Sequence, residues 1–296
     1  MKNEKKFIHM LGYASALGGV NPECAEGPLV LQHSKELNQL GSRLAKAGIH
    51  FNWDQIIQPL AFLPDNKAEE IQRISQVLAM STAELTRKKE LFLVFGGDHT
   101  SAIGTWSGVR AALKGSLGLI WIDAHMDSHT PTTSETGRFH GMSLAALLGY
   151  GDSRFTQLFS FSPKINPEQL CLIGVRSYEE GEVKLLKKLG VRLYFMDEVK
   201  KRGLSLILQE ALALVTQGTA GFGLSIDVDS LDPQEAPGVD VPEPDGLTVK
   251  DLSEALKPVT RDPRLQGIEV VEFNPHKDID QRTEKAIVSL IQAMIG

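Results

Sequence analysis

Short apolar runs alternate with amphipathic stretches along most of the chain. Successive positions within each run are apolar, which is typical of parallel strands covered by helices on both faces. A strand with one face in solvent would instead alternate apolar and polar positions. The predicted strands are Phe7–Gly12, Leu91–Phe95, Leu117–Asp123, Leu170–Val175, Val191–Phe195, Gly221–Ile226 and Ile268–Phe273.

The stretches between these runs carry apolar residues at helical spacing. One helix is predicted to begin at Gly27–Pro28, because proline suits the first turn. Alternation of strand and helix predicts an α/β fold, with one doubly wound, mostly parallel sheet and helices on both faces. We expect a single domain over residues 1–296. The apolar helix positions are Leu29, Leu37, Leu40 and Leu44, then Ile71, Ile74, Leu78 and Leu85, and near the end Ile287, Leu290, Ile291 and Met294.

Composition narrows the possible partners. The 296 residues carry a net charge of -6, which argues against a nucleic-acid partner because phosphate binding needs a basic surface. No apolar run reaches the length of a membrane span. The two cysteines, Cys24 and Cys171, form no disulfide framework, and no apolar signal core follows the polar segment Met1–Lys6. These features predict a cytoplasmic protein.

Polar and small residues gather where the predicted strands end. In a doubly wound sheet, ligands bind beyond the carboxyl ends of the strands. These segments therefore identify the region in which a functional site is expected. They are Gly96–His99, Asp123–Asp127, Arg176–Glu179, Asp227–Asp229 and Glu272–Pro275.

Three of these strand ends carry residues that bind metals. Asp123, His125 and Asp127 follow one strand at every second position, and alternate residues of an extended chain project to the same side. Asp227 and Asp229 repeat this spacing after another strand. His99 follows a third strand and adds a second imidazole to the four carboxylates.

Four carboxylates at one edge of a sheet would repel each other strongly without a cation. Oxygen and nitrogen ligands without a thiolate favour manganese, with cobalt, nickel or zinc as substitutes. Two such ions can share a water and make it a nucleophile near neutral pH. A single Asp-X-His or Asp-X-Asp at a strand end is usually a turn or a helix cap. Three clusters at separate strand ends instead predict a binuclear metal site.

The same segments resemble the signature motifs of a known family. Gly96–His99, Asp123–Asp127 and Ser225–Pro233 are similar in order and spacing to the three motifs of the arginase/agmatinase (ureohydrolase) family, and among its members most similar to arginases. The likeness continues at Gly18–Val20 with Glu26–Pro28 and at Glu272–Pro275, so it covers essentially the whole chain.

This resemblance implies a three-layer α/β/α fold and two Mn²⁺ ions per chain that share a bridging hydroxide. It also implies that Asp123 and Asp227 contact both ions and that Asp127 orients the hydroxide. One ion would be bound by His99, Asp123, Asp127 and Asp227, and the other by His125, Asp123, Asp227 and Asp229.

Two further residues receive catalytic roles from the resemblance. Glu272 would pair with the guanidinium of the substrate, a charge-assisted contact that suits a planar cation. His140 corresponds to the histidine with which arginases pass a proton to the departing amine, a task for which the histidine pKa is well placed. The alternative is that His140 only begins the helix that follows it.

The likeness is weaker where the distal end of the substrate would bind. His129 and Arg138 stand where arginases usually have asparagines, and Thr136 replaces a serine. Glu179 replaces an aspartate near the α-amine, and Val241 replaces a threonine that supports the guanidinium-binding glutamate. Arg138 could bind a carboxylate through a bidentate fork, or it could be a solvated loop residue.

L-Arginine, hydrolysed to L-ornithine and urea, is therefore the first substrate prediction. A guanidino acid and formimidoyl-glutamate are the alternatives that also have a carboxylate, whereas agmatine has none. Other classes remain: a zinc deacetylase with one metal, a binuclear phosphoesterase, and an inactive binding protein. The complete set of six ligands argues against the first and the last. The resemblance also predicts a homo-oligomer, either a trimer or a hexamer.

Overall fold

The strands form one sheet that orders the rest of the chain around it. A computed structural model describes residues 6–60, 66–159 and 163–296, so most of the polar segment Met1–Lys6 lies outside the described residues. Within the described ranges, eight strands pair in the order β2-β1-β3-β8-β7-β4-β5-β6. Every pairing is parallel. The strands are β1 Lys6–Tyr13, β2 Ile49–Ile57, β3 Phe92–Gly96, β4 Leu117–Ile122, β5 Ile165–Val175, β6 Arg192–Phe195, β7 Gly221–Asp227 and β8 Leu265–Val271.

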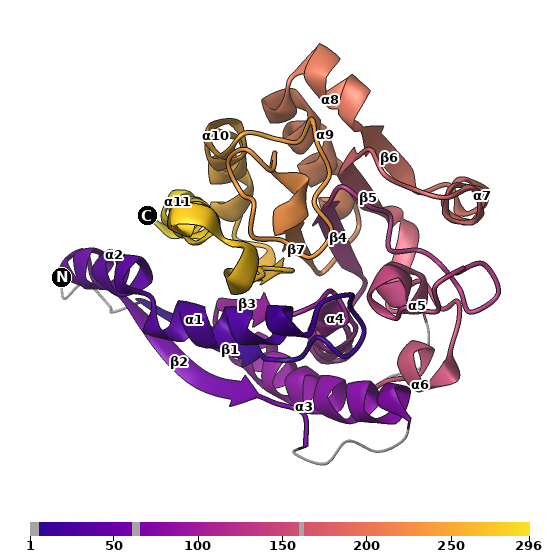
Figure 1. Ribbon diagram of the computed structural model, residues 1–296, viewed down its shortest axis with the longest axis horizontal. Coiled ribbons are helices and arrows are strands. Elements are labelled where there is room, and N and C mark those ends of the chain that lie inside the picture. The colour runs from indigo at the N-terminus through magenta and orange to yellow at the C-terminus, as the bar shows by residue number, and fades with distance from the viewer. Residues whose placement is uncertain (1–5, 61–65, 160–162) are drawn as a thin grey trace.

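Helices cover both faces of this sheet, as the alternating pattern predicted. One apolar core joins the sheet to α1, α2 and α8 to α11, and the other joins it to α3, α4, α5 and α7. In Figure 1, α2 and α3 lie on opposite sides of β1 and β2. The helices are α1 Gly27–His33, α2 Lys35–Lys46, α3 Lys67–Lys88, α4 Ser101–Ala112, α5 Ser143–Leu147, α6 Ser153–Thr156, α7 Glu180–Leu189, α8 Met196–Arg202, α9 Leu204–Thr216, α10 Val249–Thr260 and α11 Arg282–Ile295. Short 3-10 helices are η1 Pro22–Glu26, η2 His140–Met142, η3 Val228–Ser230, η4 Pro275–Lys277 and η5 Ile279–Gln281.

Two predictions of local structure were wrong. The helix predicted from Gly27 is two helices, because Ser34 adopts an extended conformation and its Oγ accepts a hydrogen bond from the backbone N–H of Leu37. Leu31 is consequently buried in α1, and Leu29 only partly. The strand β2 was missed because it lies at the edge of the sheet, where polar and apolar positions mix instead of forming an apolar run.

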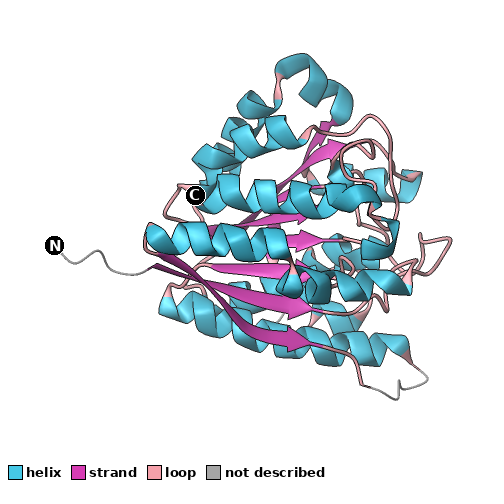
Figure 2. Cartoon of the chain, turned by 60° about the vertical axis from the view of Figure 1, so that its left-hand side comes forward, coloured by secondary structure: helices cyan, strands magenta, loops and turns pink. Residues whose placement is uncertain are grey.

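The strand order creates the place for a site. The chain builds β1, β2 and β3 on one side, crosses to β4, β5 and β6, and then fills the gap with β7 and β8. Ligands of open α/β sheets bind where the strand order changes direction. The strand arrows in Figure 2 point the same way, and loops gather beyond their heads. The adjacent strands β3, β8, β7 and β4 are therefore expected to supply the site.

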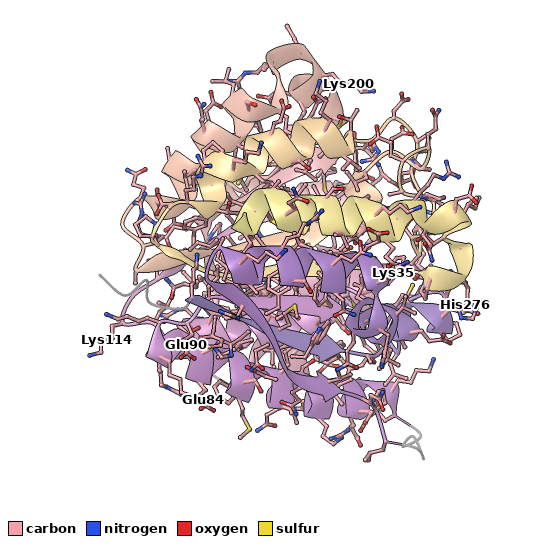
Figure 3. The ribbon with its side chains drawn as sticks, turned by 90° about the vertical axis from the view of Figure 1, so that its left-hand side faces the viewer. Lys35, Glu84, Glu90, Lys114, Lys200 and His276 are labelled. Carbon is pink, nitrogen blue, oxygen red and sulfur yellow. The ribbon has the colours of Figure 1, made fainter. Side chains whose placement is uncertain are left out.

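Away from the carboxyl ends of the strands, charged side chains lie on the solvent-exposed surface. Glu84, Lys114 and Lys200 are exposed and project from the outside of the molecule in Figure 3. Glu84 pairs with Lys88 one helical turn away, at 2.7 Å. Such exposed pairs contribute little to stability. Among the described residues, no helix has both the length and the apolar character needed to span a membrane.

Candidate active site

Buried carboxylates concentrate at the carboxyl ends of the four central strands. Asp123 follows β4, Asp227 ends β7, and Asp229 lies in η3 directly after it. Each of these side chains is at most 3% exposed. His99, which is fully buried, follows β3. Burying unpaired charge costs several kcal/mol per ion, on the order of the total stability of a domain, so these groups must be compensated.

The first cluster surrounds one nitrogen atom. Nδ1 of His99 lies 3.0 Å from Oδ2 of Asp127 and 3.3 Å from Oδ2 of both Asp123 and Asp227. Among the described residues, this buried nitrogen has no hydrogen-bond partner. A nitrogen lone pair surrounded by carboxylate oxygens is the donor set of a divalent cation. The residues of this cluster therefore fit a metal ion.

A second cluster shares a residue with the first. Nδ1 of His125 lies 3.0 Å from Oδ2 of Asp229 and 3.6 Å from Oδ1 of Asp123. Ligand atoms of Asp123, His125 and Asp229 lie within 4.8 Å of one another, as do those of His99, Asp123 and Asp227. Asp123 is thus common to both groups, as a residue that bridges two ions would be. The structure brings all six predicted ligands together.

The backbone brings these side chains together in a way that extended-chain alternation does not describe. β4 ends at Ile122, one residue before the predicted end, and the following loop turns because Oδ1 of Asp123 accepts a hydrogen bond from the backbone N–H of His125. Asp227 and Asp229 repeat this turn at 2.8 Å. Asp127 adopts a left-handed conformation, with φ of 47°. The predicted convergence is correct, but turns and not strand geometry produce it.

The pKa values of the clustered carboxylates indicate the same need for cations. Burial and the neighbouring charges of Asp229 and Asp123 raise the pKa of Asp227 well above its usual value. Burial likewise raises the pKa of Asp229, with a contribution from Asp123. Burial would also raise the pKa of Asp123, but its contacts with the imidazoles of His125 and His99 outweigh burial and lower it. A divalent cation would remove this conflict.

Trp121 is a site residue that the motif analysis missed. Its indole Nε1 donates a hydrogen bond to Oδ2 of Asp123 at 2.8 Å. Its ring also stacks on the imidazole of His99, with 4.0 Å between centroids and 13° between planes. Trp121 therefore fixes the orientation of two ligands at once. The signal was present in the sequence, as the one aromatic residue in an otherwise aliphatic strand.

Glu272 and His140 meet beside the metal clusters. Oε1 of Glu272 lies 3.1 Å from Nδ1 of His140 and accepts a hydrogen bond from the backbone N–H of His99 at 2.9 Å. Oε2 is buried and has no hydrogen-bond partner among the described residues. Glu272 also adopts a left-handed conformation, φ 67°, which is uncommon for a residue other than glycine. Such strain is found chiefly at functional sites.

Each of these two groups changes the pKa of the other. Burial raises the pKa of Glu272 to about 7, although the hydrogen bond to His140 opposes this. Burial would lower the pKa of His140, but the hydrogen bond and charge of Glu272 outweigh burial and raise it to about 9. A proton can therefore reside on either group near neutral pH, which suits a pair that handles protons during catalysis.

A cavity of about 200 Å³ is lined by His125, Asp127, Asp227 and Asp229 from the two clusters and extends to the distal loop. Each of the predicted substrate-binding residues His129, Thr136, Arg138 and Glu179 lines it. Its remaining lining residues that matter for chemistry are Ser134, Glu182, Asp240, Glu243, His140 and Glu272.

The distal residues differ in how they are paired. Nε2 of His129 lies 2.7 Å from Oε2 of Glu179 and 3.5 Å from Oε2 of Glu182. Arg138 is exposed at the cavity, and among the described residues its guanidinium forms no ion pair. His129 is therefore occupied by carboxylates, whereas the fork of Arg138 is available to a ligand.

Glu182 is a second residue that sequence reasoning missed. It is buried, and its Oε1 accepts a hydrogen bond from the backbone N–H of Ser128 at 3.0 Å. Its Oε2 accepts a hydrogen bond from the backbone N–H of Glu179 at 3.1 Å. Burial and the neighbouring Glu179 raise the pKa of Glu182 to about 8. The signal was its position, three residues after Glu179, which forms the N-cap of α7.

Arg176 connects the loops behind the second cluster. Its Nη2 donates to the carbonyl oxygens of Asp229 at 2.7 Å and Glu243 at 2.9 Å, and its Nε donates to that of Pro244 at 2.9 Å. One guanidinium thus holds the backbone of a ligand and the 243–244 loop in a fixed relation. The sequence places Arg176 at a strand end but does not identify these partners.

Comparison with known proteins agrees with this geometry. The family model described as Arginase family matches residues 8–296. The chain belongs to the arginase family. An arginase from Brevibacillus brevis is 37% identical over 98% of each chain, and one from Bacillus caldovelox is 34% identical over 98% of each. The crystal structure of arginase from Bacillus subtilis superposes with a TM-score of 0.90 at 33% identity, covering 98% of this chain and 99% of that one.

Family membership decides between the classes that the sequence left open. The protein is a ureohydrolase, an enzyme that hydrolyses C–N bonds, and not a phosphoesterase or an inactive binding protein. Arginase-family enzymes depend on metal, and the two histidine–aspartate clusters contain residues that could bind one. The predicted three-layer fold is confirmed by the superposition.

Proposed function

We propose that this ureohydrolase is a manganese-dependent arginase that converts L-arginine and water to L-ornithine and urea. The observation that carries the proposal is that Asp123 is shared by two clusters of potential cation ligands, and that residues of both clusters line one cavity. One ion would be held by His99, Asp123, Asp127 and Asp227, and the other by His125, Asp123, Asp227 and Asp229. When bound, two manganese ions would supply a water activated for nucleophilic attack.

The residues around the clusters have separate tasks in this proposal. Asp127 accepts a hydrogen bond from the attacking water and orients it. Glu272 binds the guanidinium, since its Oε2 is buried and has no hydrogen-bond partner among the described residues. His140, held by Glu272, delivers a proton to the departing amine of ornithine. The reaction balances because water adds to the guanidinium carbon and the bond from that carbon to the side-chain nitrogen breaks.

Recognition of the α-carboxylate and α-ammonium is assigned to the distal loop. Arg138 is the cation available for the carboxylate, with Thr136 beside it on the same loop. Glu179 and Glu182 carry the oxygens that an ammonium group needs, although His129 already contacts both. An α-amino acid therefore has to share these carboxylates with His129.

Because His129 already contacts Glu179 and Glu182, a substrate without an α-ammonium group is the second candidate. A guanidino acid or formimidoyl-glutamate would place a carboxylate on Arg138, and neither has a free α-ammonium group that needs Glu179 or Glu182. Agmatine has no carboxylate and would leave Arg138 unused. The structure thus supports carboxylate-bearing substrates over agmatine, and arginine among them through the arginase relatives.

A substrate panel tests the proposal. Protein reconstituted with manganese should be assayed with arginine, agmatine, guanidinobutyrate, guanidinopropionate and formimidoyl-glutamate, with product identified for each. We expect the highest kcat/KM for arginine, with equal amounts of urea and ornithine. Metal-stripped protein and the Asp123→Ala variant are the inactive controls. Turnover of another amidine with no urea from arginine would contradict the proposal. The predicted homo-oligomer is checked separately by light scattering.

A further inference from the structure

A buried group of polar side chains lies directly behind His99, between β7, β8 and α4. At its centre is Glu269 of β8, whose side chain is fully buried. Oε1 accepts hydrogen bonds from the hydroxyls of Ser101 at 2.8 Å and Thr105 at 2.7 Å. Oε2 accepts from the indole of Trp106 at 3.2 Å and from the hydroxyl of Ser225 at 2.9 Å. Both oxygens are therefore surrounded by donors, as an ionised carboxylate requires.

The surrounding sequence is adapted to hold this carboxylate. Ser101 and Thr105 are one helical turn apart, so both hydroxyls lie on the face of α4 that covers β8. Gly223 of β7 leaves room for the indole, because a Cβ there would lie 2.1 Å from the ring of Trp106. A carboxylate in this position is thus built into the packing of α4 against the sheet.

Ser225 connects Glu269 to the metal site. Its Oγ lies 2.9 Å from Oε2 of Glu269 and 3.0 Å from Nε2 of His99. A serine hydroxyl has one proton, and a carboxylate can only accept. Since Ser225 gives its proton to Glu269, its oxygen must accept one from Nε2–H of His99. With the proton on Nε2, the neutral imidazole carries its lone pair on Nδ1, the atom that faces Asp123, Asp127 and Asp227.

We propose that Glu269 is a positioning residue for the metal-binding site, acting through Ser225 to fix the tautomer of His99 and direct its Nδ1 lone pair at the cation. A carboxylate behind a metal-binding histidine also makes the imidazole a stronger ligand. The inference rests on the proposed function, because it assumes that His99 binds metal. It adds a residue that touches neither metal nor substrate, 170 positions away from the histidine it orients.

His99 and His125 differ in the group that contacts the Nε2 atom of the imidazole. Nε2 of His125 has Glu243 as its outer neighbour, with 3.7 Å between Nε2 and Oε1, and that carboxylate is 28% exposed. His99 has a buried relay of two hydrogen bonds instead. Loss of the Glu269 charge should therefore weaken one metal site and leave the site of His125 much less affected.

The experiment measures manganese affinity, not turnover. Metal-stripped protein is titrated with MnCl₂ by calorimetry, and bound metal is counted after equilibrium dialysis at limiting manganese. We expect Glu269→Gln, which keeps the shape of the side chain, to weaken one of two sites by roughly 10–100-fold. Ser225→Ala breaks the relay while keeping the charge, and should weaken the same site. It also provides the test should Glu269→Gln not fold.

Glu70→Gln is the matched control, since Glu70 is a buried carboxylate on α3 that pairs with Arg73 at 2.6 Å. It should lower the melting temperature without weakening either metal site. Two metals bound with unchanged affinity in Ser225→Ala would overturn the inference, and so would an equal loss of affinity in Glu70→Gln. Wild-type protein that binds fewer than two ions would instead contradict the proposed function, so the two failures are distinguishable.

Discussion

Nδ1 of His140 lies 3.1 Å from Oε1 of Glu272, although 132 positions separate the two residues in the chain. Each changes the pKa of the other, and both line the cavity that His125, Asp127, Asp227 and Asp229 also line. This pair joins guanidinium binding to proton delivery. It is also where the proposed chemistry is most open to test.

Replacing Glu272 should change how His140 titrates. Burial alone lowers the pKa of His140, and the hydrogen bond and charge of Glu272 raise it from 6.5 to about 9. Glu272→Gln removes that charge, so the pKa of His140 should fall. Nuclear magnetic resonance of the imidazole in metal-free protein measures the midpoint directly. An unchanged midpoint would show that Glu272 does not control this proton.

The same pair predicts how stability depends on pH. The folded protein holds the His140 proton more tightly than the unfolded chain, because the folded pKa is raised. The stability that His140 contributes is therefore fully present below pH 6.5 and is lost as pH rises through about 9. In Glu272→Gln this loss should become smaller, because Glu272 is the largest contributor to the raised pKa and only the charges of Asp127 and Asp98 remain to raise it. Melting temperatures of the two metal-free proteins across this range test the sign, and parallel curves would refute it.

His140→Ala should lower turnover by about 10²–10⁴-fold, the usual effect of losing a general acid or base. Both metals should remain bound, since His140 delivers a proton and does not ligate. Steady-state kinetics and a metal count on the same preparation give both quantities. His33→Ala, an exposed histidine on α1, is the control and should retain activity. Loss of metal from His140→Ala would assign that residue a different role.

Arg138→Ala should weaken kcat/KM for arginine much more than for agmatine. A charge-assisted contact to a carboxylate contributes about 1.5–3 kcal/mol, or roughly 10–150-fold. Arg138→Lys should recover only part of the lost kcat/KM for arginine, because an ammonium group cannot contact two carboxylate oxygens as the guanidinium fork does. Arg87→Ala, an exposed arginine of α3, is the control. Equal losses for the two substrates, or no loss for either, would remove Arg138 from the substrate site.

The sequence predicts the central strands and the convergence of the six candidate ligands well, for physical reasons. Strands such as Leu117–Ile122 are apolar on both faces, and the carboxyl ends of parallel strands meet at one edge. The edge strand Ile49–Ile57 lacks that apolar pattern, and the break at Ser34 depends on a cap that apolar spacing does not reveal. Contacts between residues that are far apart in the sequence could not be predicted either. Glu269 meets Ser101 across 168 positions, and no local pattern identifies that pairing.

Metal content tests the central claim most directly. Protein dialysed against manganese and then freed of loosely bound ions should contain two manganese ions per chain by elemental analysis. Asp123→Ala and Asp227→Ala should lose the most metal, because the proposal has each residue contact both ions, and Asp123 belongs to both clusters. His125→Ala should retain more metal than Asp123→Ala, since His125 belongs to only one. A wild-type count of two with this order of losses is the predicted result, and a wild-type count of one or none would contradict the binuclear site.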